Sequence, residues 1–165
     1  LCNIYLTVIR GTPVVVQLLI IYFVIFSSVR IDKSFAAILT FGINSGAYQA
    51  EIFRSGINSV PKGQMEAGRS LGFSYPQTMI NIIMPQVIKN VLPTLANEFI
   101  VLMKETSVAG YIALDDLTKA GDVIRSRTYS AMMPFLAVAL LYLIMVMLFS
   151  YLVKLLERRL ARSGR

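Results

Sequence analysis

The stretch Val60–Pro85 reads VPKGQMEAGRSLGFSYPQTMINIIMP and contains no apolar run long enough to cross a membrane. Pro61 is suited to start a helix over Lys62–Leu71, because the N–H that a proline lacks would have no partner in the first turn anyway. Gly72 fits the left-handed position at which many helices end. The stretch therefore begins with a short helix that stops at a glycine.

A second short helix is predicted directly after this glycine. Ser74 and Gln77 form the Ser-x-x-Gln pattern of a capping box, with Pro76 in the first turn. Pro85 is expected to end or kink the second helix. Such an elbow of two helices is too small to be stable alone. We therefore expect it to pack on its own membrane helices and against another protein, burying an apolar face made of Met65, Leu71, Phe73, Met79, Ile82 and Ile83.

The same stretch resembles the EAA signature of the permeases of ABC importers. That signature is Glu-Ala-Ala, then Gly, then Ile-x-Leu-Pro, and the spacing agrees throughout. The matching positions are Glu66, Ala67, Gly68, Gly72, Ile82, Met84 and Pro85. Gly68 replaces the second alanine and Met84 replaces the leucine, and both replacements are small or conserve volume.

Two tetrapeptides extend the resemblance to nearly the whole chain. RGTP at Arg10–Pro13 and KETS at Lys104–Ser107 are similar to the branch that imports polar amino acids. The resemblance implies an all-α polytopic membrane helix bundle with the type I ABC importer permease fold, in a single permease domain over residues 1–165. Members of the family usually carry another membrane helix upstream, so an N-terminal helix is expected to be missing before Leu1.

Composition also indicates a membrane protein. The chain is 56% hydrophobic and 15% charged, with a mean hydropathy of +0.65, whereas soluble domains are about 45–50% apolar and about 25% charged. Cys2 is its single cysteine and it has no histidine, so neither an internal disulfide nor a metal site is expected. The net charge of +7 is better explained by membrane topology than by nucleic-acid binding.

Hydropathy predicts four membrane spans, with a cytoplasmic coupling loop at residues 54–90. The spans are residues 13–29, 34–53, 91–114 and 131–153. In the second span, Gly42 and Gly46 form a GxxxG pair that permits close helix contact. Residues 115–130 are expected to form a polar external loop.

The basic tail after residue 153 predicts a cytoplasmic C-terminus, because positive charge accumulates on that side of a membrane. Counting back along the spans puts the coupling loop in the cytoplasm and residues 115–130 outside. Arg30 and Lys33 would then lie outside as well, which is a mild contradiction that Asp32 partly offsets.

The third span carries charges that a lipid-facing helix would not tolerate. Glu98, Lys104 and Glu105 would each cost about 2.5–3.5 kcal/mol at a helix centre, so this helix must face a bundle interior or a watery cavity. Glu98, Leu102 and Glu105 lie on one helical face. Ion pairing with Lys104 or a neighbouring helix would explain the acids, and so would a substrate site near the membrane midplane.

The resemblance to permeases favours the substrate site. Two acids on one face would suit a cationic amino acid such as arginine, lysine or histidine. The predicted substrate-binding residues are Gln17, Glu98, Leu102, Glu105, Thr106 and Ser107.

The elbow also has two interpretations. It could be an interfacial amphipathic loop whose glycine only turns the chain, or a coupling helix seated in a cleft of a separate ATPase subunit. The resemblance favours the coupling helix, with Glu66 and Gly72 contacting the ATPase. The coupling residues so implied are Glu66, Ala67, Gly68, Gly72 and Pro85.

Enzyme chemistry is not expected in this polypeptide. Gly63–Ser70 nearly spells a phosphate-binding loop, but Arg69 replaces its lysine and no strand precedes it. No nucleophile is paired with a base in the sequence. The resemblance implies that ATP and magnesium bind a partner ATPase subunit and that this chain binds no cofactor or metal.

We therefore predict the permease subunit of an ATP-driven importer of polar amino acids, with cationic ones favoured, in the bacterial inner membrane. The implied partners are ABC ATPase subunits, a second permease copy or paralogue, an extracytoplasmic substrate-binding protein, the amino acid and membrane lipid, without nucleic acid. A non-transporting membrane protein that recruits a cytosolic partner, or a channel, are the alternatives.

Overall fold

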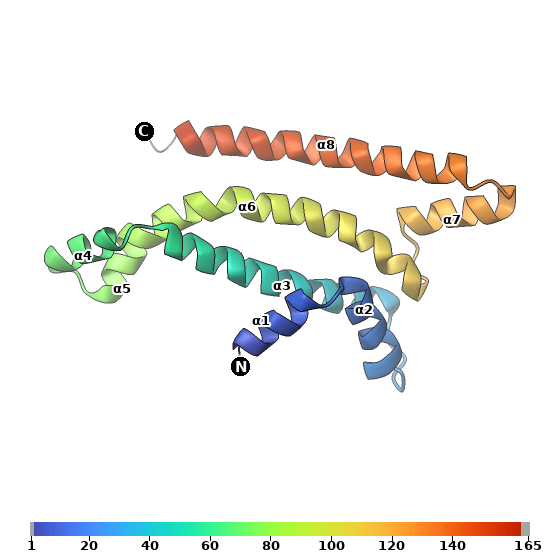
Figure 1. Cartoon of the computed structure of the whole chain (residues 1–165), viewed down its shortest axis with the longest axis horizontal. Coiled ribbons are helices and arrows are strands. Elements are labelled where there is room, and N and C mark those ends of the chain that lie inside the picture. The colour runs from blue at the N-terminus through green and yellow to red at the C-terminus, as the bar shows by residue number, and fades with distance from the viewer. Residues whose placement is uncertain (1, 163–165) are drawn as a thin grey trace. The chain divides into compact units, whose positions relative to one another are not determined.

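The computed structural model describes residues 2–162, and side chains as far as Arg158. Every element assigned within this range is helical, as the sequence predicts. In chain order they are α1 (Cys2–Gly11), α2 (Val14–Leu19), the π-helical η1 (Ile20–Ile25), α3 (Lys33–Ser59), α4 (Lys62–Ser70), α5 (Tyr75–Thr78), the π-helical η2 (Met79–Ile83), α6 (Met84–Glu105), the 3-10 helix η3 (Thr106–Ile112), α7 (Leu117–Thr128) and α8 (Met132–Arg162) (Figure 1).

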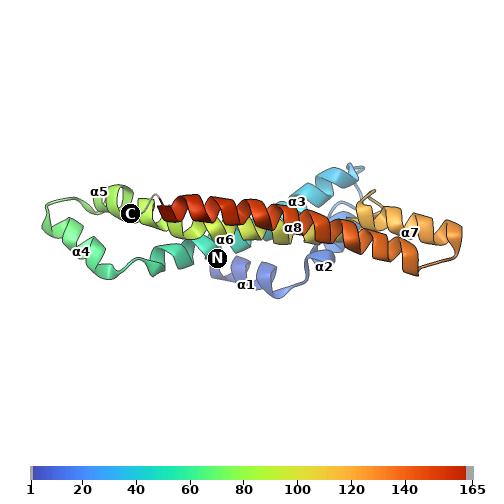
Figure 2. The same cartoon turned by 90° about the horizontal axis from the view of Figure 1, so that it is seen from above.

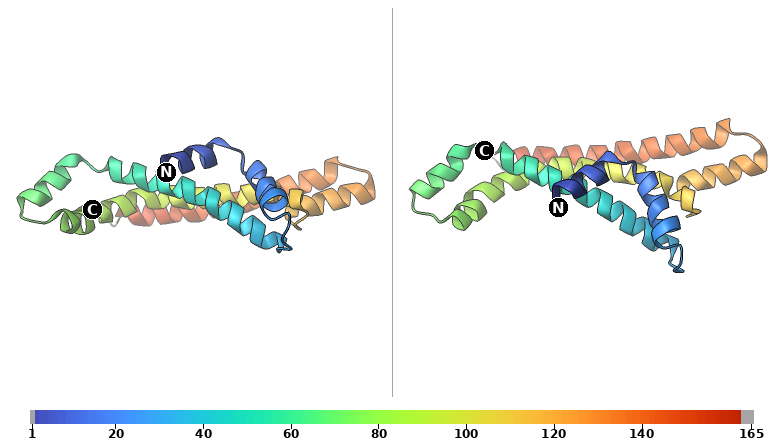
Figure 3. Two further views of the ribbon diagram at one scale, coloured as in Figure 1. Left: turned by 90° about the horizontal axis from the view of Figure 1, so that it is seen from below. Right: turned by 60° about the horizontal axis from the view of Figure 1, so that its bottom comes forward.

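One compact unit consists of Leu1–Tyr48 and Phe99–Tyr151. Helix α1 lies along α3 in both views of Figure 3, where the Tyr5 hydroxyl donates a 2.6 Å hydrogen bond to the carbonyl oxygen of Ile43. The Arg10 guanidinium lies 5.4 Å from the ring centre of Tyr48. The buried core of the unit joins α2, α3 and η3 through Leu18, Ala37, Phe41, Ala109 and Ile112.

The expected polar loop at residues 115–130 is a helix, so that prediction is wrong. The carboxylate of Asp116 caps α7 by accepting a 2.6 Å hydrogen bond from the backbone N–H of Lys119. Asp122 then pairs with Lys119 at 3.4 Å and with Arg125 at 2.8 Å along one side of the helix. Capping and ion pairs at a spacing of three residues stabilise a helix whose composition resembles that of a loop.

The second compact unit consists of Gln49–Glu98 and Leu152–Arg165. Its core contains Val60, Ile83, Val87 and Val91. The end of α3 runs beside the start of α6, where the Asn90 amide donates a 3.1 Å hydrogen bond to Ser59 Oγ. Helices α4 and α5 form a hairpin at the end of this unit (Figure 2).

Pro85 does not end its helix, so that alternative of the prediction is wrong, and a kink at Pro85 stays a prediction. Helix α5, η2 and α6 follow one another without a break from Tyr75 to Glu105. The backbone N–H of Met84 bonds to the carbonyl of Met79, five residues back. A π-helical turn directly before Pro85 gives the ring room, because a proline in a regular α-helix clashes with the carbonyl four residues earlier.

Close glycine packing occurs at positions other than the predicted pair. A Cβ added to Gly42 would meet nothing within 4 Å, and one on Gly46 would lie 3.6 Å from the Tyr5 hydroxyl. A Cβ on Gly121 of α7, in contrast, would come within 2.6 Å of Val138 on α8. The prediction of close contact through Gly42 and Gly46 is therefore wrong for the described part of this chain.

Helix α8 is long and apolar enough to cross a membrane over Met132–Arg158, where residues 131–153 were predicted to do so. Helices α1 and α2–η1 pass the same test only as a pair bent by 104°. The predicted spans at residues 34–53 and 91–114 fall on α3 and on α6 with η3. Their crossing of a membrane stays a prediction.

Candidate functional site

The first helix of the elbow ends at Gly72, as predicted. Gly72 has φ +87°, a left-handed value that glycine adopts at little cost. Its N–H bonds to the carbonyl of Arg69 at 3.0 Å, and the N–H of Phe73 bonds to the carbonyl of Gly68 at 3.2 Å. These two bonds constitute a Schellman motif, which satisfies carbonyls that a helix end leaves unpaired.

The second helix begins with the predicted capping box. The backbone N–H of Ser74 donates to Gln77 Oε1 at 2.8 Å, and the N–H of Gln77 donates to Ser74 Oγ at 3.5 Å. The glycine that ends the first helix and the capping box that begins the second together fix the direction of the chain through the turn between them.

Helix α4 interlocks with the second helix through Gly68 and Thr78. An added Cβ on Gly68 would lie 2.4 Å from Thr78 Cγ2 and 3.0 Å from Ile82 Cδ1. Thr78 has no exposed surface, and its hydroxyl donates a 3.0 Å hydrogen bond to the carbonyl of Ser74. The methyl group of Thr78 therefore occupies the space that an alanine would need, which explains why glycine replaces the second alanine of the EAA pattern.

The predicted coupling residues divide into exposed and buried ones. Glu66, Ala67, Gly72 and Pro85 are exposed, whereas Gly68 is buried. Thus Glu66 and Ala67 are accessible to a partner, whereas Gly68 serves the packing of α4 against Thr78 inside the elbow.

The apolar face of the elbow is only partly buried. Met65, Met79, Ile82 and Ile83 belong to the core of the second unit, as expected. Leu71 is 76% exposed and Phe73 is also exposed, so this part of the face is not buried within the chain, and its burial against another protein stays a prediction. Tyr75 is exposed beside them, and grouped exposed apolar residues of this kind mark surfaces that bind other proteins.

Gln17 is 8% exposed and lies in the first turn of α2, from which its side chain bonds back across the bend that follows α1. Its Nε2 donates to the carbonyl oxygens of Ile9 at 2.7 Å and Thr12 at 3.1 Å, and to Thr12 Oγ1 at 2.8 Å. Its Oε1 accepts a 3.0 Å hydrogen bond from Asn44 Nδ2 on α3. The nitrogen end of the amide thus holds the RGTP segment and the oxygen end connects α2 to α3, and a role in substrate binding stays a prediction.

The predicted acidic face is carried by α6. Glu98 belongs to the second unit, whereas Leu102 and Glu105 belong to the first. Leu102 packs against the core of the first unit. Thr106 and Ser107 lie in η3. Thr106 Oγ1 donates to the carbonyl of Met103 at 2.7 Å.

Ser107 lines a cavity of the first unit, of about 350 Å³. The other lining residues are Gly110, Tyr111, Thr118, Lys119, Asp122 and Phe135. Arg125 and Lys119, which bond to the carboxylate of Asp122, hold the pKa of this group below its ordinary value. The cavity therefore has a charged wall on α7.

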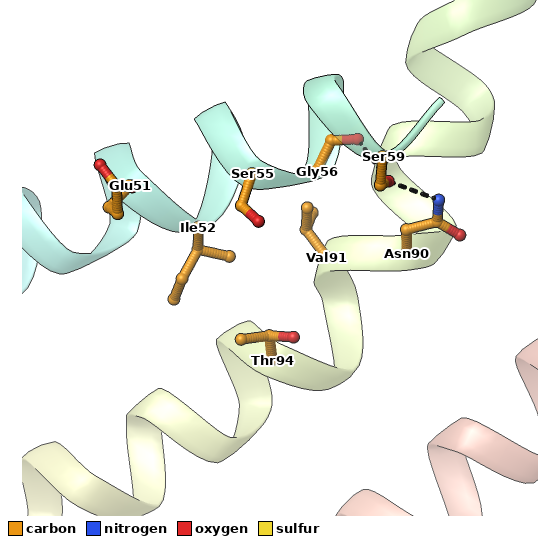
Figure 4. A pocket seen from close by; sticks show the side chains of 8 residues that line it. All are labelled: Glu51, Ile52, Ser55, Gly56, Ser59, Asn90, Val91 and Thr94. Carbon is orange, nitrogen blue, oxygen red and sulfur yellow. Dashed lines mark hydrogen bonds between the residues drawn. The ribbon is translucent and has the colours of Figure 1, made fainter. Parts of the chain in front are cut away.

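A second cavity was not foreseen from the sequence. It lies between α3 and α6 within the second unit and has a volume of about 540 Å³ (Figure 4). We call it the α3–α6 cavity, and its lining residues are Glu51, Ile52, Ser55, Gly56, Ser59, Asn90, Val91 and Thr94. The recurrence of polar residues every four positions, as in Glu51, Ser55 and Ser59, is the signal that could have indicated it.

The sequence matches a family described as the binding-protein-dependent transport system inner membrane component, over residues 1–162. This chain belongs to that family. The chain is 41% identical over 160 residues to the glutamine transport system permease protein GlnP of Escherichia coli, covering 95% of this chain and 73% of GlnP. It is 36% identical over 162 residues to the arginine transport system permease protein ArtQ of Bacillus subtilis, covering 97% of this chain and 74% of ArtQ.

A solved structure supports the same assignment. The chain matches a crystal structure of an amino acid ABC transporter with histidines at a TM-score of 0.90 and 45% sequence identity, over 95% of this chain and 74% of that chain. The predicted all-α permease fold is confirmed. The family match and the named relatives together show that this chain is a permease of an amino acid ABC importer. A permease of this family is a transport subunit and not itself an enzyme.

Proposed function

We propose that this permease forms the path for a polar amino acid and couples that path to a separate ATPase through α4. The observation that carries the coupling role is the interlocked elbow. Glu66 and Ala67 are exposed on a helix that Gly72 terminates and Gly68 fixes against Thr78. A partner that binds α4 and displaces it would therefore also displace the start of the long α5–η2–α6 helix.

The elbow offers an ATPase both charge and apolar surface. The carboxylate of Glu66 can pair with a basic residue of the partner, and Leu71, Phe73 and Tyr75 supply exposed apolar area. Interfaces of this kind combine an apolar centre with a polar rim. ATP and magnesium would bind the ATPase subunit, and closure of the ATPase would drive alternating access in the permease.

We further propose that the substrate is a polar amino acid, with cationic ones favoured. Relatives at 41% and 36% identity are named as glutamine and arginine permeases, which supports the polar class. Glu98 and Glu105 on α6 supply the negative charge for a cationic side chain. Intramembrane acids are costly and generally mark a substrate or ion path.

The complete importer would contain a second permease copy or paralogue and an extracytoplasmic substrate-binding protein. We place α7 on the external side as the surface that meets the binding protein. Its carboxylate and its bases, Asp122, Lys119 and Arg125, allow complementary pairing. The basic end of α8 would lie in the cytoplasm, following the positive-inside rule.

Purification of this chain from native membranes, with identification of the proteins that come with it, tests the coupling role. We expect an ATP-binding subunit to co-purify with the wild-type chain and to be lost with Glu66→Arg. Glu157→Arg, a charge reversal outside the elbow, is the matched control and should retain the ATPase. An ATPase that stays bound to Glu66→Arg and supports normal uptake would show that Glu66 does not couple the two subunits.

A further inference from the structure

We propose that Lys33 is a positioning residue, whose ammonium group holds the turn between η3 and α7 and so sets α7 for contact with the binding protein. The inference rests on the external role proposed for α7, and it adds the residue that fixes this helix. A base at position 33 is unexpected on topological grounds, because positive charge accumulates on the cytoplasmic side and Lys33 would lie outside. A contact that requires the base accounts for its presence there.

Lys33 connects two parts of the first unit that are distant in sequence. It is the first residue of α3, and its Nζ donates a 3.1 Å hydrogen bond to the carbonyl oxygen of Ala113, 80 residues later. The lysine is half-buried, and both residues line a cavity of about 510 Å³ that Asp115 also lines. The bond therefore joins the start of α3 to the end of η3 inside one compact unit.

The turn that Lys33 holds has an unfavourable backbone conformation. Ala113 has φ 55° and ψ 38°, a left-handed conformation that is costly for a residue with a Cβ. The N–H of Ala113 bonds to the carbonyl of Gly110 at 2.9 Å, and that of Leu114 to the carbonyl of Ala109 at 3.3 Å. Glycine usually occupies this position of a Schellman motif. The bond from Lys33 offsets part of the cost that alanine brings.

The position of α7 follows from this turn. Asp116 comes three residues after Ala113 and caps α7 by accepting a 2.6 Å hydrogen bond from the N–H of Lys119. A Cβ added to Gly110 would lie 3.5 Å from Asp116 Oδ1 and from Lys119 Cβ, which is ordinary contact distance. The first turn of α7 therefore packs directly on η3, and a change of backbone conformation at Ala113 would displace it.

A fixed α7 affects transport through the affinity for the binding protein. Lys119, Asp122 and Arg125 are the charged groups of α7 proposed to pair with that protein. Ordering a mobile surface on association costs free energy, and a surface already fixed in its bound arrangement avoids this cost. Lys33 would thus raise the affinity for the binding protein without touching it, while the later steps of the transport cycle do not depend on it.

The test is ATP hydrolysis by the whole importer in nanodiscs, measured against the concentration of its binding protein, which is saturated with a mixture of L-glutamine and L-arginine. Lys33→Met removes the ammonium group and keeps an apolar stem. Loss of one hydrogen bond corresponds to about a threefold to tenfold increase in the KM for the binding protein, and we expect kcat to stay at the wild-type value. Lys33→Arg keeps a donor and should restore the wild-type KM. Arg30→Met removes a nearby exposed base and should leave KM unchanged.

A second variant tests the link to the strained turn. Ala113→Gly removes the cost of the left-handed conformation, so Lys33→Met should raise KM less in that background than in the wild type. Hydrogen exchange should report the same effect locally, with the amides of Leu114 and Lys119 exchanging faster in Lys33→Met. An unchanged KM in Lys33→Met, an equal increase in Arg30→Met, or the same increase in both backgrounds would overturn the positioning role.

The outcomes separate this inference from the proposed function. An importer that transports normally and whose KM for the binding protein does not respond to Lys33→Met removes the positioning role and leaves the proposed function intact. A wild-type importer whose ATP hydrolysis ignores the binding protein, while Lys33→Met still accelerates exchange at Leu114 and Lys119, keeps the bond to Ala113 and refutes the external role proposed for α7.

Discussion

Replacing Gly68 by alanine would restore the family's EAA pattern, yet we expect it to loosen the elbow. The new Cβ would lie 2.4 Å from Thr78 Cγ2, about 1 Å closer than the 3.4 Å at which ordinary contact begins. Overpacking of this kind costs about 1–3 kcal/mol, whereas alanine in place of glycine inside a helix gains about 0.8–1 kcal/mol. The net expectation is a loss of stability of up to about 2 kcal/mol in the packing of α4.

Thr78→Ser provides the matched background, because it removes Cγ2 and keeps the hydroxyl that bonds to Ser74. In that background the Cβ of Gly68→Ala would still lie 3.0 Å from Ile82 Cδ1 and from the hydroxyl oxygen of residue 78, so the substitution should cost clearly less than in the wild type. The two substitutions therefore interact, by about 1–3 kcal/mol if the clash is the whole effect.

Hydrogen exchange of the α4 amides in the purified importer measures this effect locally, and the amides of Leu71 and Phe73, bonded to Ala67 and Gly68, report the helix end. Gly68→Ala alone should exchange faster there than the wild type, and faster than the double variant. The ratio of transport to ATP hydrolysis should also be lower in Gly68→Ala than in the wild type, since a loosened α4 no longer moves the following helix rigidly. If Gly68→Ala has the same effect in both backgrounds, Thr78 does not fill the space and the reasoning is refuted.

Three further predictions concern the other polar residues. Glu98→Gln should reduce arginine uptake more than glutamine uptake, because it removes a charge and not a shape; an equal reduction, measured as kcat/KM for each substrate, would count against an acid that recognises cations. Gln17→Leu should lower the free energy of unfolding of the purified chain by about 1–3 kcal/mol, the cost of leaving the buried groups that bond to the Gln17 amide without partners. A Tm equal to that of the wild type would show that these hydrogen bonds are dispensable. The pKa of the Asp122 carboxyl, measured by carbon NMR, should lie below its ordinary value, because Arg125 and Lys119 favour the charged form. The stabilisation that this carboxylate contributes is present above the unfolded pKa of about 3.9 and is lost as the pH falls through the lower folded pKa. Arg125→Gln should move the titration midpoint of Asp122 upward.

Local signals in the sequence predicted the elbow correctly. The glycine stop at Gly72 and the capping box of Ser74 and Gln77 depend on bonds between residues that are close in sequence, so their pattern is sufficient. Pro85 shows the limit of such rules. A proline disrupts a regular helix, but the π-helical turn before it lets the helix continue, and nothing in the residue types foretells that turn.

Features that depend on distant residues were not predictable in this way. The GxxxG pair at Gly42 and Gly46 has room around it, while Gly56, Gly68 and Gly121 are in close contact, because what faces a glycine is set by the tertiary structure. Helix α7 was read as a loop because its composition is polar. For the same reason the α3–α6 cavity became evident only when two helices separated in sequence were placed side by side.

The single amide of Gln17 bears on how this protein is made. Its hydrogen-bond partner Asn44 follows 27 residues later, so α2 leaves the ribosome before the group that bonds to its buried oxygen does. Until α3 arrives, the bend after α1 has an unsatisfied polar group, which lipid does not accommodate. Helices α2 and α3 should therefore enter the membrane as a pair, and a nascent chain truncated before Asn44 should be integrated less stably than one that extends beyond it.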